Sequence, residues 1–94
     1  MDNEINRTTW IVIYGITSDG VKFRPSSWAE MLIEGVGLTS FGRDHKIHYT
    51  RHIWTTLMNG CFKYEQPTAF AEIMRFANNN KLTVNTYNNT IALL

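Results

Sequence analysis

The stretch from residue 8 to residue 16 constrains the fold of this chain more than any other. It reads Thr-Thr-Trp-Ile-Val-Ile-Tyr-Gly-Ile, so it is rich in β-branched and aromatic residues and almost continuously apolar. Such residues favour extended backbone, and a run without polar alternation is typical of a central strand with both faces covered. The sequence therefore predicts a sheet that has this stretch in its interior.

A turn and a helix are expected after this strand. Asp19-Gly20 favours a turn, because glycine adopts positive φ without steric cost, and residues 21–23 are predicted to return as a short strand. Ser27, followed three residues later by Glu30, has the pattern of a capping box at a helix start. The next apolar residues repeat at spacings of three and four and predict one buried helix face ending near residue 37: Trp28, Met31, Leu32 and Val36.

The middle of the chain predicts two antiparallel strands. Residues 47–58 have the alternation of an extended segment. Asn59-Gly60 is a strong hairpin signal because both residues adopt positive φ readily. We therefore expect a type I′ turn there, with a returning strand through residues 61–64.

A second helix and a last strand complete the pattern. Pro67 suits the first turn of a helix, where its missing N–H has no cost. Three asparagines, residues 78–80, are expected to end that helix, and residues 82–87 to form a strand. The apolar face of the helix is expected to consist of Phe70, Ile73, Met74 and Ala77.

The resulting order predicts an α+β fold of the ferredoxin-like type. Its elements run β-α-β-β-α-β, which gives a mainly antiparallel sheet with two helices on one face. We expect one domain, residues 1–94, with residues 1–7 as a disordered tail. The sheet face without helices is the surface that we expect to recognise a partner.

Composition excludes several classes of protein. One cysteine, Cys61, excludes an internal disulfide and a cysteine-built zinc site. The sequence has no run of 18 apolar residues that could span a membrane. Residues 1–7 also lack the apolar core of a secretory signal. We therefore expect a cytoplasmic protein without membrane contact.

One segment resembles the most distinctive stretch of a known family. Residues 23–32 read Phe-Arg-Pro-Ser-Ser-Trp-Ala-Glu-Met-Leu, which is similar to Phe-Arg-Pro-Ser-Asp-Trp-Ala-Glu-Arg-Leu in small proteobacterial proteins of unknown function. The likeness extends over most of residues 10–86. Ser27 and Met31 depart from the pattern. The resemblance implies a bacterial, cytoplasmic, single-domain protein and no particular activity.

A basic and aromatic segment is the first candidate for a binding surface. Residues 42–63 hold four Lys and Arg residues against one carboxylate, Asp44, although the whole chain has a net charge of only +1. Such a surface attracts a nucleic-acid backbone and stacks on bases, or it contacts a protein partner. The candidates are Arg43, Lys46, His48, Tyr49, Arg51, His52 and Trp54.

A second candidate is a small anion site at the start of the first helix. Exposed N–H groups and the helix dipole attract anions there, and an arginine adds two parallel donors. The residues in position are Arg24, Ser26 and Ser27. The alternative is that the two serines only start the helix while Arg24 pairs with an acid such as Glu30.

The histidines and the cysteine do not have the sequence pattern of a metal site or a catalytic site. His45, His48 and His52 would share one side of a helix, but on a strand His45 points away from the other two. Cys61 has no neighbour in sequence that would activate it, and a lone strand cysteine is typically a small buried apolar residue. We therefore expect no metal, no cofactor and no catalytic residues.

The sequence as a whole favours a non-enzymatic module that acts by binding itself or another protein. Three Trp, four Tyr and five Phe exceed what the core of so small a domain must hold, and surplus aromatics are typical of interfaces. A sensor of a small anionic metabolite and a weak binder of single-stranded RNA through residues 43–64 remain as alternatives.

Overall fold

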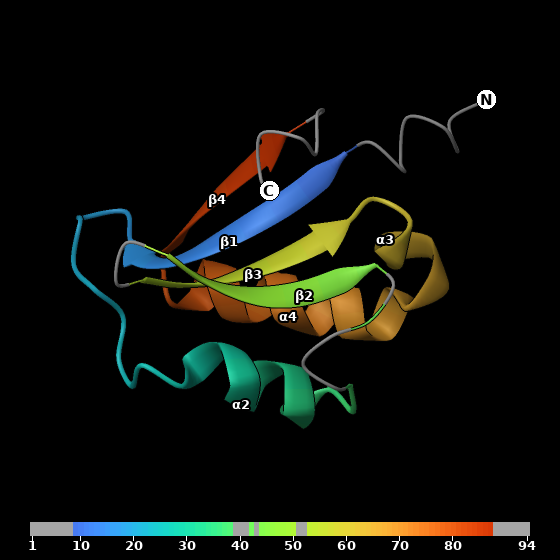
Figure 1. The fold of residues 1–94 in the computed structure, drawn as a ribbon, viewed down its shortest axis with the longest axis horizontal. Coiled ribbons are helices and arrows are strands. Elements are labelled where there is room, and N and C mark those ends of the chain that lie inside the picture. The colour runs from blue at the N-terminus through green and yellow to red at the C-terminus, as the bar shows by residue number, and fades with distance from the viewer. Residues whose placement is uncertain (1–8, 39–41, 43, 51–52, 88–94) are drawn as a thin grey trace.

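Four strands and three helices make up the described part of the chain, which is residues 9–38, 42, 44–50 and 53–87 of a computed structural model (Figure 1). The strands are β1 (Trp10–Thr17), β2 (His45–Thr50), β3 (Ile53–Asn59) and β4 (Leu82–Tyr87). The helices are α2 (Trp28–Gly35), α3 (Phe62–Glu65) and α4 (Pro67–Asn79). The predicted tail, residues 1–7, lies outside the described residues.

The strands form one antiparallel sheet in the order β2-β3-β1-β4. β1 pairs with β3 on one side and with β4 on the other, so the prediction of a central strand is confirmed. Ile13 lies opposite Thr56 on β3 and Val84 on β4. The predicted short strand after β1 is reduced to a single bridge between Ile16 and Lys22.

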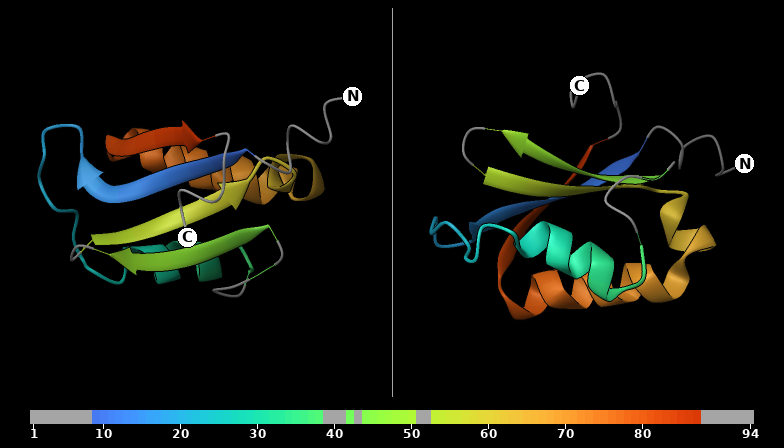
Figure 2. Two further views of the ribbon diagram at one scale, coloured as in Figure 1. Left: turned by 45° about the horizontal axis from the view of Figure 1, so that its top comes forward. Right: turned by 60° about the horizontal axis from the view of Figure 1, so that its bottom comes forward.

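The core lies between this sheet and the helices. α2 and α4 cover the same face of the sheet, as the two views of Figure 2 show. Alternation along each strand sends every second side chain to that face, where apolar groups from sheet and helices meet. The largest fully buried apolar side chains of the core cluster are Phe62, Ile13, Ile33, Met58 and Ile73.

The hairpin predicted at Asn59-Gly60 is wrong. Asn59 ends β3, and its side-chain oxygen accepts a hydrogen bond of 2.8 Å from the backbone N–H of Cys61. The chain then enters the short helix α3, where Phe62 is 1 % exposed. Burial of this aromatic ring in the core outweighs the turn preference of the dipeptide, so residues 61–64 are not a strand.

The predicted strand 47–58 divides into two for the same reason. β2 ends at Thr50 and β3 begins at Ile53, and these two residues lie opposite each other. The pair of strands that the sequence placed around residue 60 therefore lies earlier in the chain. The described residues hold the four strands of the expected β-α-β-β-α-β order, but α3 stands where the strand 61–64 was expected and is a helix that the sequence does not predict.

The first helix begins where expected but without its capping box. Ser27 occupies the N-cap position, yet its φ and ψ of −86° and 13° differ from the extended conformation that side-chain capping requires. Its hydroxyl instead approaches the sulfur of Met31 at 3.4 Å. The N–H of Trp28 bonds to the carbonyl of Pro25 at 3.0 Å, so a backbone turn starts this helix.

The second helix agrees with its prediction at the start and nearly so at the end. Pro67 is its first residue, and Asn80 caps it by donating from its side chain to the carbonyl of Phe76 at 2.9 Å. The left-handed conformation, however, falls on Lys81, with φ of 56°, and not on an asparagine. Among the described helices none is long and apolar enough to cross a bilayer.

Gly15 is predicted to be essential for packing of α2 on the sheet. A methyl group at this position would lie 2.6 Å from Nε1 of Trp28 and 2.8 Å from the carbonyl oxygen of Trp54. Gly15→Ala should therefore lower the free energy of unfolding by about 1–3 kcal/mol, the usual cost of overpacking. Urea denaturation followed by circular dichroism measures this change.

Gly35→Ala is the matched control. A methyl group there meets nothing within 4 Å, and Gly35 is the last residue of α2. Alanine should leave the stability unchanged or raise it by up to about 1 kcal/mol, because it has the higher helix propensity. Equal losses of stability in the two variants would contradict the assigned contact between Gly15 and Trp28.

Candidate functional site

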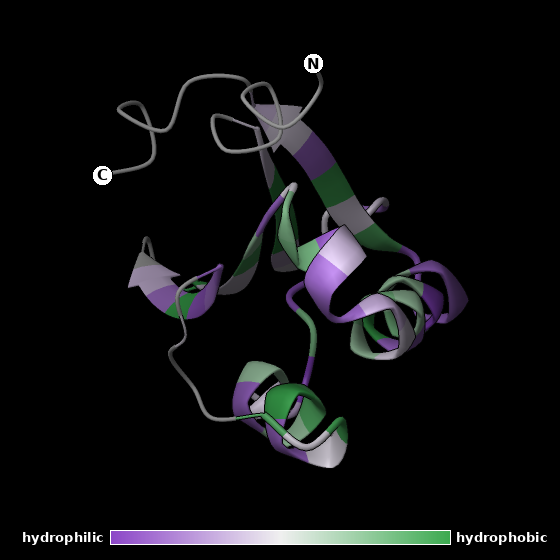
Figure 3. Ribbon diagram, turned by 90° about the vertical axis from the view of Figure 1, so that its right-hand side faces the viewer, coloured by the Kyte–Doolittle hydropathy of each residue, from purple (hydrophilic) through white to green (hydrophobic). Residues whose placement is uncertain are grey.

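The helices α2 and α4 stand apart on their side of the sheet (Figure 3). Side chains from both helices and from the segment before α2 line a cleft of about 570 Å³ between them. This volume is in the usual range for ligand sites, about 300–1,000 Å³. Its lining residues are Phe23, Pro25, Trp28, Met31, Leu32, Gly35, Val36, Glu72, Arg75, Phe76 and Asn79.

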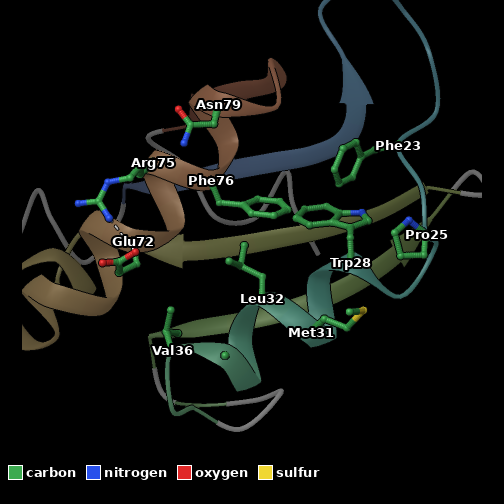
Figure 4. Close-up of a pocket in the computed structure, with 11 residues that line it drawn as sticks. Phe23, Pro25, Trp28, Met31, Leu32, Val36, Glu72, Arg75, Phe76 and Asn79 are labelled. Atoms are coloured by element: carbon green, nitrogen blue, oxygen red, sulfur yellow. Dashed lines mark ion pairs between the residues drawn. The ribbon is translucent and has the colours of Figure 1, made fainter.

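Three aromatic rings form one wall of the cleft (Figure 4). Trp28 of α2 and Phe76 of α4 are stacked with an interplanar angle of 7° and centroids 6.1 Å apart. Phe23 meets both rings edge-on, at 5.9 Å and 5.8 Å between centroids. Both arrangements are favourable for the ring quadrupoles, so the three rings hold α2 and α4 at a fixed separation.

The rim of the cleft carries an adaptable apolar group and an ion pair. Met31 on α2 is 59 % exposed. On α4, Nη1 of Arg75 lies 2.8 Å from Oε1 of Glu72, the contact drawn as a dashed line in Figure 4. Since both partners are about half exposed, the pair contributes little to stability, but it presents both charge signs to an occupant.

The lining of the cleft is mainly apolar and aromatic. Its described lining contains no histidine, cysteine, serine or lysine, so a nucleophile with an adjacent base is missing there. What the lining offers is apolar and aromatic surface, with polar groups from one helix only. Such a surface holds an apolar group and orients it by its polar end.

The opposite face of the sheet also carries aromatic residues. The hydroxyl groups of Tyr14 on β1 and Tyr87 on β4 lie 2.7 Å apart. The ammonium of Lys46 on β2 lies 5.8 Å from the ring centroid of Trp10, within cation–π distance. The centre of this face is not open, however, because Val12 is only 2 % exposed. The prediction of a free recognition platform is therefore wrong for its centre.

The tyrosine pair shifts two pKa values in opposite directions. Burial, followed by the hydrogen bond to Tyr87, raises the pKa of Tyr14. The hydrogen bond from Tyr14, and a second from the side-chain amide of Asn85 at 3.4 Å, lower the pKa of Tyr87. Tyr14 therefore acts as the donor of the pair when Tyr87 ionises.

The structure does not bring the basic and aromatic candidates together. Lys46 and His48 lie on the helix-free face, opposite Leu57 and Thr55 of β3. Tyr49 and Trp54 lie opposite each other on the other face, with ring centroids 4.7 Å apart. The remaining candidates, Arg43, Arg51 and His52, lie outside the described residues.

The candidate anion residues are all exposed. Arg24, Ser26 and Ser27 precede α2 at the surface, and the hydroxyl of Ser27 is directed to Met31. Glu30 places a negative charge in the first turn of the same helix, which opposes anion binding. The anion site stays a prediction.

The histidines are separated as well. His45 is 7 % exposed and packs against Phe62, with ring centroids 5.3 Å apart, beside a smaller pocket of about 320 Å³. His48 is on the opposite face of the sheet and exposed. Within the described ranges, no three His, Cys, Asp or Glu side chains are grouped to hold a metal ion. Cys61 is partly buried at the start of α3.

Sequence reasoning did not identify the aromatic wall of the cleft. Phe23 and Phe76 are 53 positions apart in the chain, and no local pattern indicates that they meet. Trp28 was assigned to the buried helix face, which is correct, since it is 2 % exposed. Only the surplus of aromatic residues pointed to an additional aromatic site.

Comparisons with known proteins identify a family and a fold. A family model described as a protein of unknown function (DUF3579) matches residues 7–87. A solution structure, described as the first structural representative of its family, is similar with a TM-score of 0.70 and 24 % identity. The similarity covers 87 % of this chain and 82 % of that chain, and at this identity it shows the fold alone. None of the curated proteins matches.

Tyr14→Phe is expected to raise the pKa of Tyr87 back toward its ordinary value of 10.0, because the variant removes the strongest hydrogen bond to the Tyr87 oxygen. The titration of the Tyr87 ring resonances by NMR between about pH 8 and 12 measures this shift. A Tyr87 titration that is the same in both proteins would contradict the assigned donor.

Proposed function

We propose that this chain, which belongs to a family of proteins of unknown function (DUF3579), is a non-enzymatic binding module that recognises another protein. The site of recognition is the cleft between α2 and α4. The antiparallel order β2-β3-β1-β4 with helices on one face also supports the ferredoxin-like topology that the sequence predicts.

The observation that carries the proposal is the apolar character of an open, preformed cleft. Its wall is fixed by the parallel rings of Trp28 and Phe76, so little conformational entropy is lost when the cleft is filled. Large exposed apolar surfaces mark interaction sites in single domains. Met31, at the rim, has the flexible thioether that is common where a surface must adapt to a partner.

The dimensions of the cleft indicate the form of the occupant. α2 has eight residues, about 12 Å at 1.5 Å per residue, so the cleft is bounded by about two helical turns. This length matches one or two large side chains on successive turns of a partner helix. The occupant is therefore an amphipathic segment that inserts aliphatic or aromatic side chains and places polar groups beside Arg75 and Glu72.

A second copy of the chain fits the cleft less well. It would have to present a protruding apolar patch of its own. The large apolar side chains that are exposed in the described residues lie singly on different parts of the fold: Val21, Met31, Tyr49 and Tyr64. Of these only Met31 borders the cleft.

The first test uses the fluorescent dye 1-anilinonaphthalene-8-sulfonate, an aromatic anion, as a probe of the cleft. The dye should bind saturably to the folded protein, and Met31→Glu should weaken its binding at least about tenfold, because a carboxylate at the rim must be desolvated and repels the sulfonate. Val21→Glu introduces the same change at an equally exposed apolar residue away from the cleft and should have no effect. Equal effects of both variants, or no saturable binding, would argue against the site.

The second test identifies the class of occupant. A photoreactive phenylalanine analogue placed at position 31, with position 21 as control, is crosslinked in cells and the products are analysed by mass spectrometry. The proposal requires a different protein, attached through an apolar helical segment, from position 31 only. A crosslinked dimer of the chain itself, or products that are the same from both positions, would contradict the proposed occupant.

A further inference from the structure

The described side chains on the helix-free face of the sheet share one property, which is that none of them is negatively charged. Pairing of the strands places its residues side by side: Trp10 lies between Asn59 and Tyr87, Val12 between Leu57 and Asn85, and Tyr14 between Thr55 and Thr83. β2 adds Lys46 and His48, opposite Leu57 and Thr55. None of these described strand residues carries a carboxylate, so their side chains are all cationic or neutral.

Two buried donors on this face have no hydrogen-bond partner among the residues that the structure describes. They are Nε1 of Trp10 and Oγ1 of Thr55, and Thr55 is only 3 % exposed. A buried polar group without a partner costs free energy, so an occupant that supplies the partner is favoured. Because the indole N–H can only donate, the group missing at Trp10 is an acceptor.

Cationic and aromatic groups lie together at the same place. The ammonium of Lys46 is 5.8 Å from the centroid of Trp10, and Trp10 lies opposite Tyr87 on the next strand. His48 is exposed on β2, and Asn85 is exposed on β4. Positive charges attract phosphates, while aromatic rings and amides contact bases, which is how single strands are held without base pairing.

An apolar protein partner is disfavoured on this face. Val12 and Leu57, which would form the centre of such an interface, are each 2 % exposed and have almost no apolar area left to bury. The described groups that keep accessible surface on this face include the side chains of Lys46, His48 and Asn85 and the partly buried rings of Trp10 and Tyr87. Charge complementarity therefore favours a polyanion with acceptor groups.

We infer that the helix-free face binds single-stranded nucleic acid, with Lys46 and His48 against the phosphates and Trp10 and Tyr87 against the bases. The surface is distinct from the cleft, since the sheet separates the two. The protein thus has one site for a protein partner and another for a polyanion. The strands bring together two of the basic candidates with aromatic residues that sequence analysis had not assigned to this surface.

The test is fluorescence anisotropy with a labelled 15-nucleotide oligo-uridine and with the corresponding oligo-thymidine. Binding at 50 mM salt should weaken steeply at 200 mM, as expected when phosphate contacts release counterions. Lys46→Glu, and independently His48→Glu at an exposed position, should weaken binding about tenfold or more and reduce its salt dependence. Trp10→Phe, which removes the N–H and keeps a ring, should weaken binding with little change in salt dependence.

Lys63→Glu is the control with the same change of charge. Lys63 is exposed on α3, away from this face, and its replacement should change the affinity less than about twofold. Met31→Glu in the cleft should also have no effect, so this inference can fail without the proposed function failing. Absence of binding at 50 mM salt, equal losses for Lys46→Glu and Lys63→Glu, or tighter binding of a duplex of the same length would overturn the inference.

Discussion

The contact between Gly15 and Trp28 is the constraint on which the helical side of the molecule depends. β1 is the central strand, and at Gly15 it has no side chain on the face that meets α2, so the indole of Trp28 lies directly against the backbone. With the indole fixed on the strand, the ring of Phe76 on α4 stacks against it. Both helices are thereby placed relative to the sheet, and the space that remains between them is the cleft.

The elements with strong periodicity could be predicted from sequence, and those decided by tertiary contacts could not. The apolar run around Ile13 indicates a buried strand, and the stripe of Ile73 and Ala77 indicates a buried helix face. Both can be predicted because the spacing of the apolar residues matches the period of the element that buries them. Asn59-Gly60 has an equally clear local signal, yet the burial of Phe62 decides the conformation there. Local preferences of a few tenths of a kcal/mol yield to the burial of an aromatic ring, which contributes about 1.5–3 kcal/mol.

The candidate surfaces show that residues close together in sequence need not share one face of a sheet. Lys46, Tyr49 and Trp54 are predicted to share one basic and aromatic surface because they lie close together in the sequence. In the structure the chain reverses between Thr50 and Ile53, and strand alternation sends Tyr49 and Trp54 to the helical side. Composition predicts a surplus of aromatic residues, but only the strand pairing shows which of them share a face.

The positions of the tryptophans have a spectroscopic consequence. Trp10 is on the helix-free face, while Trp28 forms the wall of the cleft on the other side of the sheet. Indole emission responds to the polarity and quenching groups in its immediate surroundings. Trp54, the third indole, also lies on the helical side, opposite Tyr49. With Trp54 replaced, the intrinsic fluorescence of the chain contains a separate reporter for each of its two surfaces, so that occupancy of each side can be observed without an attached label.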